Sequence, residues 1–217
     1  MLNEITSTAE MAWTLLLAVV RWLPWAFESV KLGRWEAAPY RGHQLSGKTL
    51  GVLGYGRLGR FVAEYGQAFR MAVLLCDHKP QSDLPPGVKQ VGFEDLLRSS
   101  DVVSIHIHLT EENRNIFDRR ALQMMKPGAV LINTSRGAII DEGALLDALR
   151  DGPLAAAGVD VICGENRADI GNHPLVRYAR SHDNLMISPH IGGVTFEPVA
   201  LVCRRMAERI VAFMEAI

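Results

Sequence analysis

Short apolar runs alternate with amphipathic segments along most of the chain. The apolar runs are rich in Val, Leu and Ile without strict alternation with polar residues, which is typical of strands buried on both faces. We expect strands at KTLGVLG (48–54), MAVLLCD (71–77), DVVSIHIHL (101–109), AVLINTS (129–135), AAAGVDVI (155–162) and NLMISPH (184–190). Strands that alternate with helices in this way predict an α/β fold, a doubly wound parallel sheet with helices on both faces.

Segments with helical periodicity lie between most of the predicted strands. Near the N-terminus, Ser7 or Thr8 can cap a helix that continues to about Trp22, with Pro24 near its end. An irregular, aromatic arm is then expected over residues 28–47, which contain several glycines and a proline. We expect further helices at 57–69, 93–100, 118–126, 141–151 and from about residue 197 to the end of the chain.

Composition and charge exclude several classes of partner. The 217 residues include 23 Lys and Arg against 24 Asp and Glu, so nothing in the net charge favours nucleic acid or an anionic membrane. The longest apolar run, residues 11–20, is too short to cross a bilayer. Three scattered cysteines, Cys76, Cys163 and Cys203, form neither a disulfide framework nor a Cys-x-x-Cys pair, which favours a cytoplasmic location.

The stretch GVLGYGRLGRFVAEYG contains a glycine motif in a specific context. Gly54, Gly56 and Gly59 follow a predicted strand and open a predicted helix, and Asp77 closes the next strand. In dinucleotide sites of the Rossmann type, such glycines permit a tight turn, close approach of a pyrophosphate and close packing of helix on strand. The phosphates then meet the N-terminus of the helix, here at Arg57 and Leu58.

The acidic residue of this motif indicates which dinucleotide is bound. A carboxylate at Asp77 can accept hydrogen bonds from the adenosine ribose and repels a 2′-phosphate, so NAD is expected and NADP is less favoured. His78 and Lys79 follow directly and weaken that preference. The alternative is a glycine-rich turn without a ligand, but turn, helix and acid occur here together.

Further motifs resemble one enzyme family. STAEMAWTLLLAVVR, LSGKTLGVLGYGRLGR, DVVSIHIHLTEENRNIFD, QMMKPGAVLINTSRG and NLMISPHIGG, in this order, are similar to motifs of the D-isomer-specific 2-hydroxyacid dehydrogenases. The resemblance extends from about Asn3 to near the C-terminus. It implies reversible hydride transfer between NAD(H) and C2 of a small 2-keto or 2-hydroxy acid.

The resemblance also implies the site residues. Three are catalytic: Arg136 of NTSRG, Glu165 of DVICGEN and His190 of SPHIGG. An arginine can hold a substrate carboxylate with its planar fork, a histidine can donate a proton near neutral pH, and a carboxylate can orient that histidine. The same motifs place further cofactor contacts at His106, Thr134, Asp160, His190 and Gly193.

Each of these residues has a simpler interpretation. An arginine after a strand is commonly a solvated surface group, and a histidine beside a Gly-Gly turn is commonly structural. His106 and His108 alternate along a predicted strand and could suggest a metal pair. Two ligands are too few for a metal site, and no Cys or carboxylate cluster follows, so we expect no metal.

The sequence departs from the family pattern in three respects. His108 replaces a usual proline near the nicotinamide side, and Asn166 replaces the proline after the catalytic glutamate. Family members also carry about a hundred residues before the first helix, which form most of a separate, flavodoxin-like substrate lobe. We therefore expect a complete cofactor site, a largely absent substrate lobe and poor turnover by this chain.

The resemblance suggests three segments and one assembly. They are a dimerisation helix and arm (1–46), an NAD-binding domain (47–195) and a C-terminal helix (196–217). In the family the coenzyme domain dimerises through this helix and arm, so we expect a homodimer formed by residues 11–22, Trp25, Phe27, Trp35 and Tyr40. Two alternatives to an enzyme remain: an NAD(H)-sensing module like the corepressors of this family, and a dimerisation module.

Overall fold

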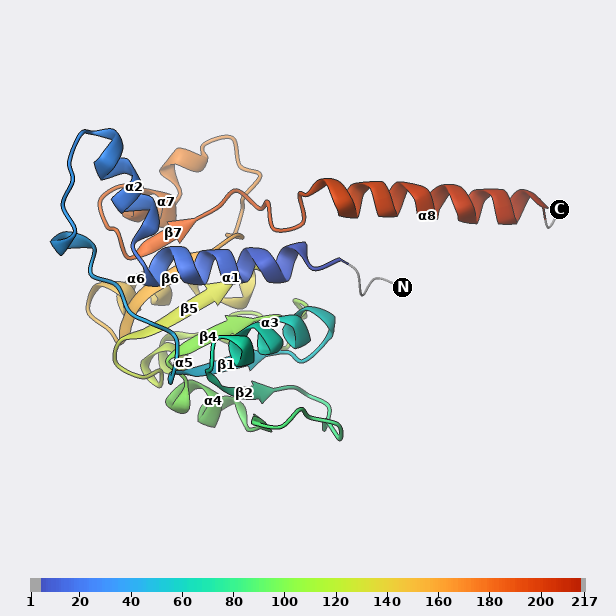
Figure 1. The fold of residues 1–217 in the computed structure, drawn as a ribbon, viewed down its shortest axis with the longest axis horizontal. Coiled ribbons are helices and arrows are strands. Elements are labelled where there is room, and N and C mark those ends of the chain that lie inside the picture. The colour runs from blue at the N-terminus through green and yellow to red at the C-terminus, as the bar shows by residue number, and fades with distance from the viewer. Residues whose placement is uncertain (1–4, 216–217) are drawn as a thin grey trace.

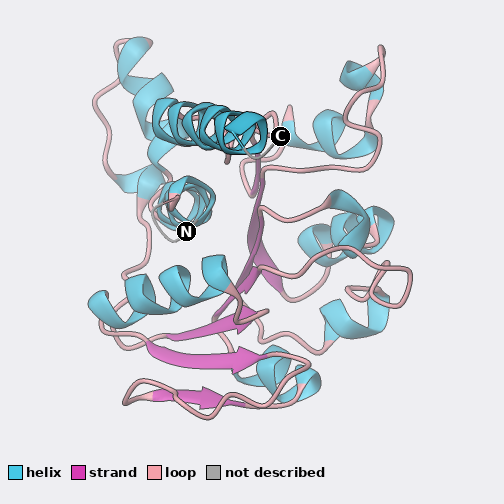
Figure 2. Ribbon diagram, turned by 90° about the vertical axis from the view of Figure 1, so that its right-hand side faces the viewer, coloured by secondary structure: helices cyan, strands magenta, loops and turns pink. Residues whose placement is uncertain are grey.

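A seven-stranded parallel sheet forms the centre of the molecule (Figures 1 and 2). The computed structural model describes residues 5–215; the outer ends of the predicted first and last segments, 1–4 and 216–217, lie outside the described residues. The strands are β1 (Thr49–Leu53), β2 (Ala72–Cys76), β3 (Val88–Gln90), β4 (Val102–Ile105), β5 (Ala129–Asn133), β6 (Leu154–Val159) and β7 (Leu185–Ile187). The predicted α/β doubly wound fold is confirmed.

The strand order places a topological switch between β1 and β4. The order across the sheet is β3-β2-β1-β4-β5-β6-β7, and every neighbouring pair is parallel. The chain moves outward from β1 through β2 to β3, and then returns to add β4 on the other side of β1. Leu53 at the end of β1 pairs with Cys76 on one side and Ile105 on the other. Ligands of open α/β sheets bind outside the carboxyl ends of the strands at such a point.

Helices cover both faces of the sheet (Figure 2). Each face has its own apolar core. On one face, Leu15 and Leu16 pack with Val52 and Val62. On the other face, Leu96, Leu122 and Leu145 belong to a second core built around Ile105 and Leu131. The helices are α1 (Ser7–Val20), α2 (Leu23–Lys31), α3 (Arg57–Ala68), α4 (Phe93–Ser99), α5 (Arg119–Gln123), α6 (Glu142–Arg150), α7 (Pro174–Ala179) and α8 (Phe196–Glu215).

The N-terminal segment differs from its prediction. The first helix ends at Val20, and a second helix, α2, covers residues 23–31 and so takes the first four residues of the arm predicted over 28–47. The rest of that arm is irregular, as predicted, apart from one short turn at Ala38–Tyr40. Trp22 adopts a left-handed conformation with φ 54° and separates the two helices. Pro24 lies in the first turn of α2, where its missing N–H costs no helical hydrogen bond. Ser7 begins α1, but its N-cap is Thr6, whose side chain caps no backbone N–H.

The predicted dimer face is also partly wrong. Trp13 of α1 is buried against Tyr65 and Phe69, and Leu15 and Leu16 are buried in the core beside the sheet, so these side chains are not available to a second chain. Two other residues of the predicted face, on α2 and the arm, are exposed: Phe27 by 61% and Trp35 by 90%. An amphipathic period alone does not show which neighbour a helix packs against.

Several strand boundaries were predicted too long, and two short elements were missed. The strand predicted over 101–109 ends at Ile105, so His106 and His108 do not alternate on a strand. The one predicted over 184–190 is limited to Leu185–Ile187. A strand ends where its hydrogen bonds to the neighbouring strand end, although the apolar run in the sequence continues beyond that residue. The three-residue β3 and the six-residue α7 lack a sequence period long enough to detect.

The last helix, α8, projects from the body of the molecule (Figure 1). Its side chains include many exposed apolar ones, among them Phe196, Val199, Met206, Ile210 and Phe213. The helix begins one residue before the predicted Glu197. None of the described helices combines the length and apolar character needed to cross a membrane.

Candidate active site

The glycine loop lies at the switch point between β1 and β4. Gly54 has φ +92°, and a Cβ there would lie 2.6 Å from the carbonyl oxygen of His106. A Cβ on Gly59 would lie 1.9 Å from the carbonyl oxygen of Gly54, so only glycine allows α3 to approach the turn this closely. Gly56, in contrast, faces open space. It precedes the first turn of α3, and no side chain caps that helix, so its free N–H groups remain available to an anion.

Asp77 is bound directly to this loop. Its Oδ2 accepts the backbone N–H of Tyr55 at 2.7 Å, and its Oδ1 accepts that of Lys79 at 2.9 Å. His78 Nδ1 lies 3.0 Å from Oδ1. Burial acts to raise the pKa of Asp77, but the two N–H bonds and the neighbouring His78 and Lys79 together lower it below its ordinary value. The carboxylate is therefore fixed and ionised beside the turn.

Arg57 opens α3 and reaches back to the start of α1. Its guanidinium donates to the carbonyl oxygen of Ile5. The predicted phosphate contact of Arg57 therefore depends on its backbone N–H or on release of this bond. Leu58, the next residue, packs against the core that α1 and α3 share.

Two polar side chains at the ends of β4 and β5 have buried atoms without partners among the described residues. They are His106, at Nδ1, and Thr134, at Oγ1. His106 Nε2 lies 2.8 Å from Ser104 Oγ. Burial lowers the pKa of His106 to about 4, so its ring is neutral at physiological pH. Buried polar atoms without partners are costly, and a bound ligand that supplies hydrogen bonds would remove that cost.

Glu165 and His190 meet although 25 residues separate them in sequence. Glu165 Oε1 lies 2.7 Å from His190 Nδ1, and both side chains are partly exposed, at 32% and 44%. His190 has φ 56°, a left-handed conformation that is uncommon outside glycine and that clusters at functional sites.

Asp160 holds the turn that carries His190. Its side chain accepts the hydroxyl of Ser188 and the backbone N–H groups of Ile191 and Gly192, and its carbonyl accepts the N–H of His190 at 2.9 Å. Asp160 is 1% exposed. A carboxylate has about four acceptor positions, so one remains for the cofactor contact that the family resemblance predicts at Asp160. A Cβ on Gly193 would face open space.

Arg136 follows β5 in a loop shaped by buried Asn133. Asn133 Nδ2 donates to the carbonyl oxygen of Arg136 at 3.0 Å, and its Oδ1 accepts the N–H of Ser135. A Cβ on the next residue, Gly137, would lie 2.3 Å from the carbonyl carbon of Ile162, so this loop packs against the segment that leads to Glu165. The exposed guanidinium donates to the carbonyl oxygen of Ser135 and, within the described part of the chain, bonds neither Glu165 nor His190.

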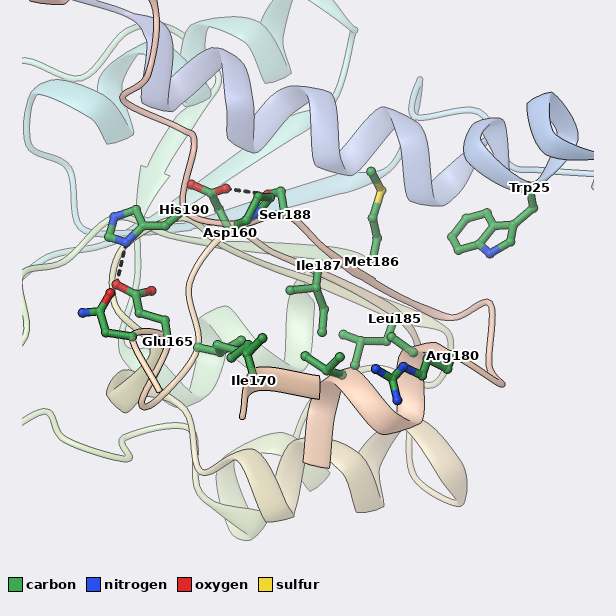
Figure 3. A pocket seen from close by; sticks show the side chains of 15 residues that line it. Trp25, Asp160, Glu165, Ile170, Arg180, Leu185, Met186, Ile187, Ser188 and His190 are labelled. Carbon is green, nitrogen blue, oxygen red and sulfur yellow. Dashed lines mark hydrogen bonds and ion pairs between the residues drawn. The ribbon is translucent and has the colours of Figure 1, made fainter. Parts of the chain in front are cut away.

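A pocket of about 690 Å³ extends from the Glu165–His190 pair along β7 (Figure 3). The pair lies at one end, Trp25 and Arg180 lie at the other, and apolar side chains such as Ile187 line the space between. Nothing in the sequence pattern indicates Arg180, because a single arginine just after a short helix has no distinguishing periodicity or motif. Nowhere among residues 5–215 do three metal-ligating side chains gather.

Comparisons with known proteins agree with this geometry. The family model described as "D-isomer specific 2-hydroxyacid dehydrogenase, NAD binding domain" matches residues 13–192. A glyoxylate reductase of Aeropyrum pernix is 39% identical over 218 residues, which cover 96% of this chain and 63% of the relative. A hydroxypyruvate reductase of Thermotoga maritima is 40% identical over 205 residues, covering 94% and 65%. The chain thus spans less than two thirds of these curated relatives.

A solved structure shows the same fold. The D-lactate dehydrogenase of Aquifex aeolicus, complexed with NAD and lactic acid, is 31% identical and superposes with a TM-score of 0.89 over 99% of this chain and 68% of that one. NAD fits the described residues, since the open face of Gly56, the uncapped start of α3 and the fixed Asp77 carboxylate match the needs of a dinucleotide. The chain belongs to the D-isomer-specific 2-hydroxyacid dehydrogenase family, of which it represents the NAD-binding domain.

Proposed function

We propose that this chain is the NAD-binding part of a dehydrogenase that interconverts a small 2-keto acid and its 2-hydroxy acid. The observation that carries the proposal is the 2.7 Å contact between Glu165 and His190, at the carboxyl edge of the sheet that carries the dinucleotide loop. Bound NAD(H) would supply the hydride chemistry, so the protein has to orient the substrate, hold its charge and move a proton.

His190 is the proposed proton donor to the alkoxide oxygen that forms when a keto group is reduced. Glu165 accepts Nδ1–H, which fixes the ring and leaves Nε2 for the substrate. In the reverse direction the same nitrogen accepts the hydroxyl proton. The left-handed turn at His190, held by Asp160, supports this role because it fixes where the ring projects.

Arg136 is the proposed carboxylate-binding residue. Its guanidinium is exposed and makes a hydrogen bond to a carbonyl oxygen of its own loop, which a carboxylate of opposite charge would replace favourably. The packing of Gly137 against residues 162–163 supports the role, since it brings the loop of Arg136 beside the loop of Glu165.

We also propose that two copies form a homodimer in the cytoplasm. The face formed by α2 and the arm exposes Leu23, Phe27, Val30, Leu32 and Trp35. Exposed apolar side chains that gather on neighbouring segments are characteristic of interfaces, and a two-fold pairing of like faces would cover them. The three cysteines are free, as expected for a reducing compartment.

The test is NADH oxidation in single turnover, with the chain in excess and glyoxylate, pyruvate or hydroxypyruvate as oxidant. The proposal expects slow oxidation that disappears in His190→Ala. His182→Ala is the matched control, because His182 stacks on Tyr178 away from the Glu165–His190 pair and should leave the rate unchanged. NADH binding without oxidation of any kind would overturn the enzymatic proposal and favour an NAD(H)-sensing module.

A further inference from the structure

The loop that carries Glu165 is held at a single residue, Cys163, by two side chains from elsewhere in the chain. Glu142, at the start of α6, accepts the backbone N–H of Cys163 through Oε1 at 2.7 Å. His173, at the start of α7, lies with Nε2 2.9 Å from the carbonyl oxygen of Cys163. Both polar groups of the Cys163 backbone are therefore occupied, two residues before Glu165.

The protonation of His173 follows from its partners. Its Nδ1 accepts the backbone N–H of Leu175 at 3.2 Å, so the neutral ring carries its proton on Nε2. That proton is directed to the carbonyl oxygen of Cys163, and Glu142 Oε2 lies 3.3 Å from the same nitrogen. His173 is 3% exposed and the side chain of Glu142 is 17% exposed, so water competes little with these bonds.

The contacts of Glu142 and His173 with the backbone of Cys163, here called the clamp, lie close in sequence to Glu165, which contacts His190. Gly164 has φ +64° and turns the chain directly after Cys163, and this turn brings Glu165 to His190. Asn166 replaces the proline that would otherwise stiffen the far side of this turn, and Arg167 N–H returns only to the carbonyl of Gly164. The position of the Glu165 carboxylate therefore depends on how Cys163, just before the turn, is held.

We propose that Glu142 and His173 are positioning residues, which hold the backbone of Cys163 so that Glu165 orients the imidazole of His190. This inference rests on the proposed function for its catalytic consequence, but the orientation itself can be measured without turnover. Burial and the adjacent Glu142 carboxylate raise the pKa of the Cys163 thiol to about 11, so the thiol stays neutral within the clamp at physiological pH.

The measurement is the tautomer of His190, read by long-range ¹H–¹⁵N NMR at about pH 9, where an ordinary imidazole is neutral. In the wild type the Nδ1–H tautomer of His190 should dominate. Glu165→Ala gives the Nδ1–H fraction of a His190 ring that no carboxylate orients. Glu142→Gln retains the shape of the side chain but has one acceptor oxygen for two donors. His173→Asn can still cap α7 but cannot reach the carbonyl of Cys163.

Both variants should lower the Nδ1–H fraction by roughly half or more of the difference between wild type and Glu165→Ala. Asp141→Asn is the matched control, since it removes one negative charge from the adjacent residue and retains the cap of α6 on Ala144. It should retain the wild-type tautomer. A wild-type tautomer in both Glu142→Gln and His173→Asn would overturn the proposal.

A second readout connects the clamp to chemistry. If the wild type oxidises NADH, Glu142→Gln should lower kcat by about 10- to 100-fold with the affinity for NADH unchanged. A wild type without turnover would count against the proposed function alone, because the tautomer measurement still decides the role of the clamp. An unchanged kcat together with an unchanged tautomer would refute the positioning role while the proposed function stands.

Discussion

Asp77 Oδ2 accepts the backbone N–H of Tyr55 at 2.7 Å, which joins the acidic end of β2 to the glycine loop after β1. The two parts of the dinucleotide motif, 22 residues apart, therefore form one rigid unit before any ligand binds. A preorganised site loses less conformational entropy on binding.

The first prediction concerns cofactor choice. Asp77→Ala should weaken NADH binding by about tenfold, which corresponds to about 1.4 kcal/mol. It should also reduce the ratio of the affinity for NADH to the affinity for NADPH. Fluorescence titration of both cofactors measures this. Asp83→Asn, in the exposed loop after β2, is the matched control and should change neither affinity. Tighter binding of NADPH than NADH by the wild type would contradict the ribose assignment of Asp77.

The second prediction separates folding from cofactor binding in the glycine loop. Gly56→Ala adds a methyl group in open space at φ −74°, so its free energy of unfolding should change little while NADH binding weakens markedly. Gly59→Ala would place its Cβ 1.9 Å from the carbonyl oxygen of Gly54 and should lower stability by about 2–3 kcal/mol. Urea denaturation and NADH titration measure the two effects. Normal NADH affinity in Gly56→Ala would show that no phosphate approaches there.

The third prediction is a pH dependence of stability caused by His106. Its pKa falls from 6.5 to about 4 on folding, so the unfolded chain binds more protons between these values. The stabilisation is complete above about pH 6.5 and is lost as the pH falls towards 4, by up to about 3 kcal/mol. Denaturation midpoints of wild type and His106→Gln, compared from pH 8 to pH 4, measure it. Parallel pH curves for the two proteins would contradict this account.

The fourth prediction is that the 217-residue polypeptide, tested alone, binds NADH well but turns over poorly. Arg136 and His190 are exposed, so a keto acid would meet them in a wet and open groove. Positioning and exclusion of water are worth effective molarities of roughly 10⁵ M or more, and much of that benefit would be missing. Stopped-flow NADH oxidation gives the rate and fluorescence titration gives the affinity. Rapid turnover would show that closure over the groove is dispensable.

The fifth prediction concerns assembly. Light scattering at micromolar concentration should give the mass of a dimer, and Phe27→Glu should shift it towards a monomer because a charge would be buried in the interface. Phe213→Glu, at a similarly exposed aromatic position on α8 (68% against 61% for Phe27), is the control and should leave the dimer intact. A monomeric wild type would rule out the pairing through α2 and the arm.

The order of elements and the cofactor class could be read from the sequence. Apolar runs such as those of β4 and β5 are buried on both faces, and that requirement is local to each run. The glycine motif is equally local, because Gly54, Gly56 and Gly59 all lie in one turn and the start of the helix that follows it. Asp77 was found because it ends the next strand, where parallel pairing places it beside that turn.

Only the tertiary structure decided which distant residues meet and where elements end. Glu165 and His190, or Glu142 and Cys163, are brought together by crossovers that no periodicity encodes. His106 was expected on a strand, but the ladder stops at Ile105 because its partner β5 ends at Asn133. Both α1 and α2 carry apolar side chains, but those of α1 are buried in the core that the helix shares with the sheet, whereas Leu23 and Phe27 of α2 are exposed. Periodicity shows that a face is apolar, whereas its partner depends on the whole fold.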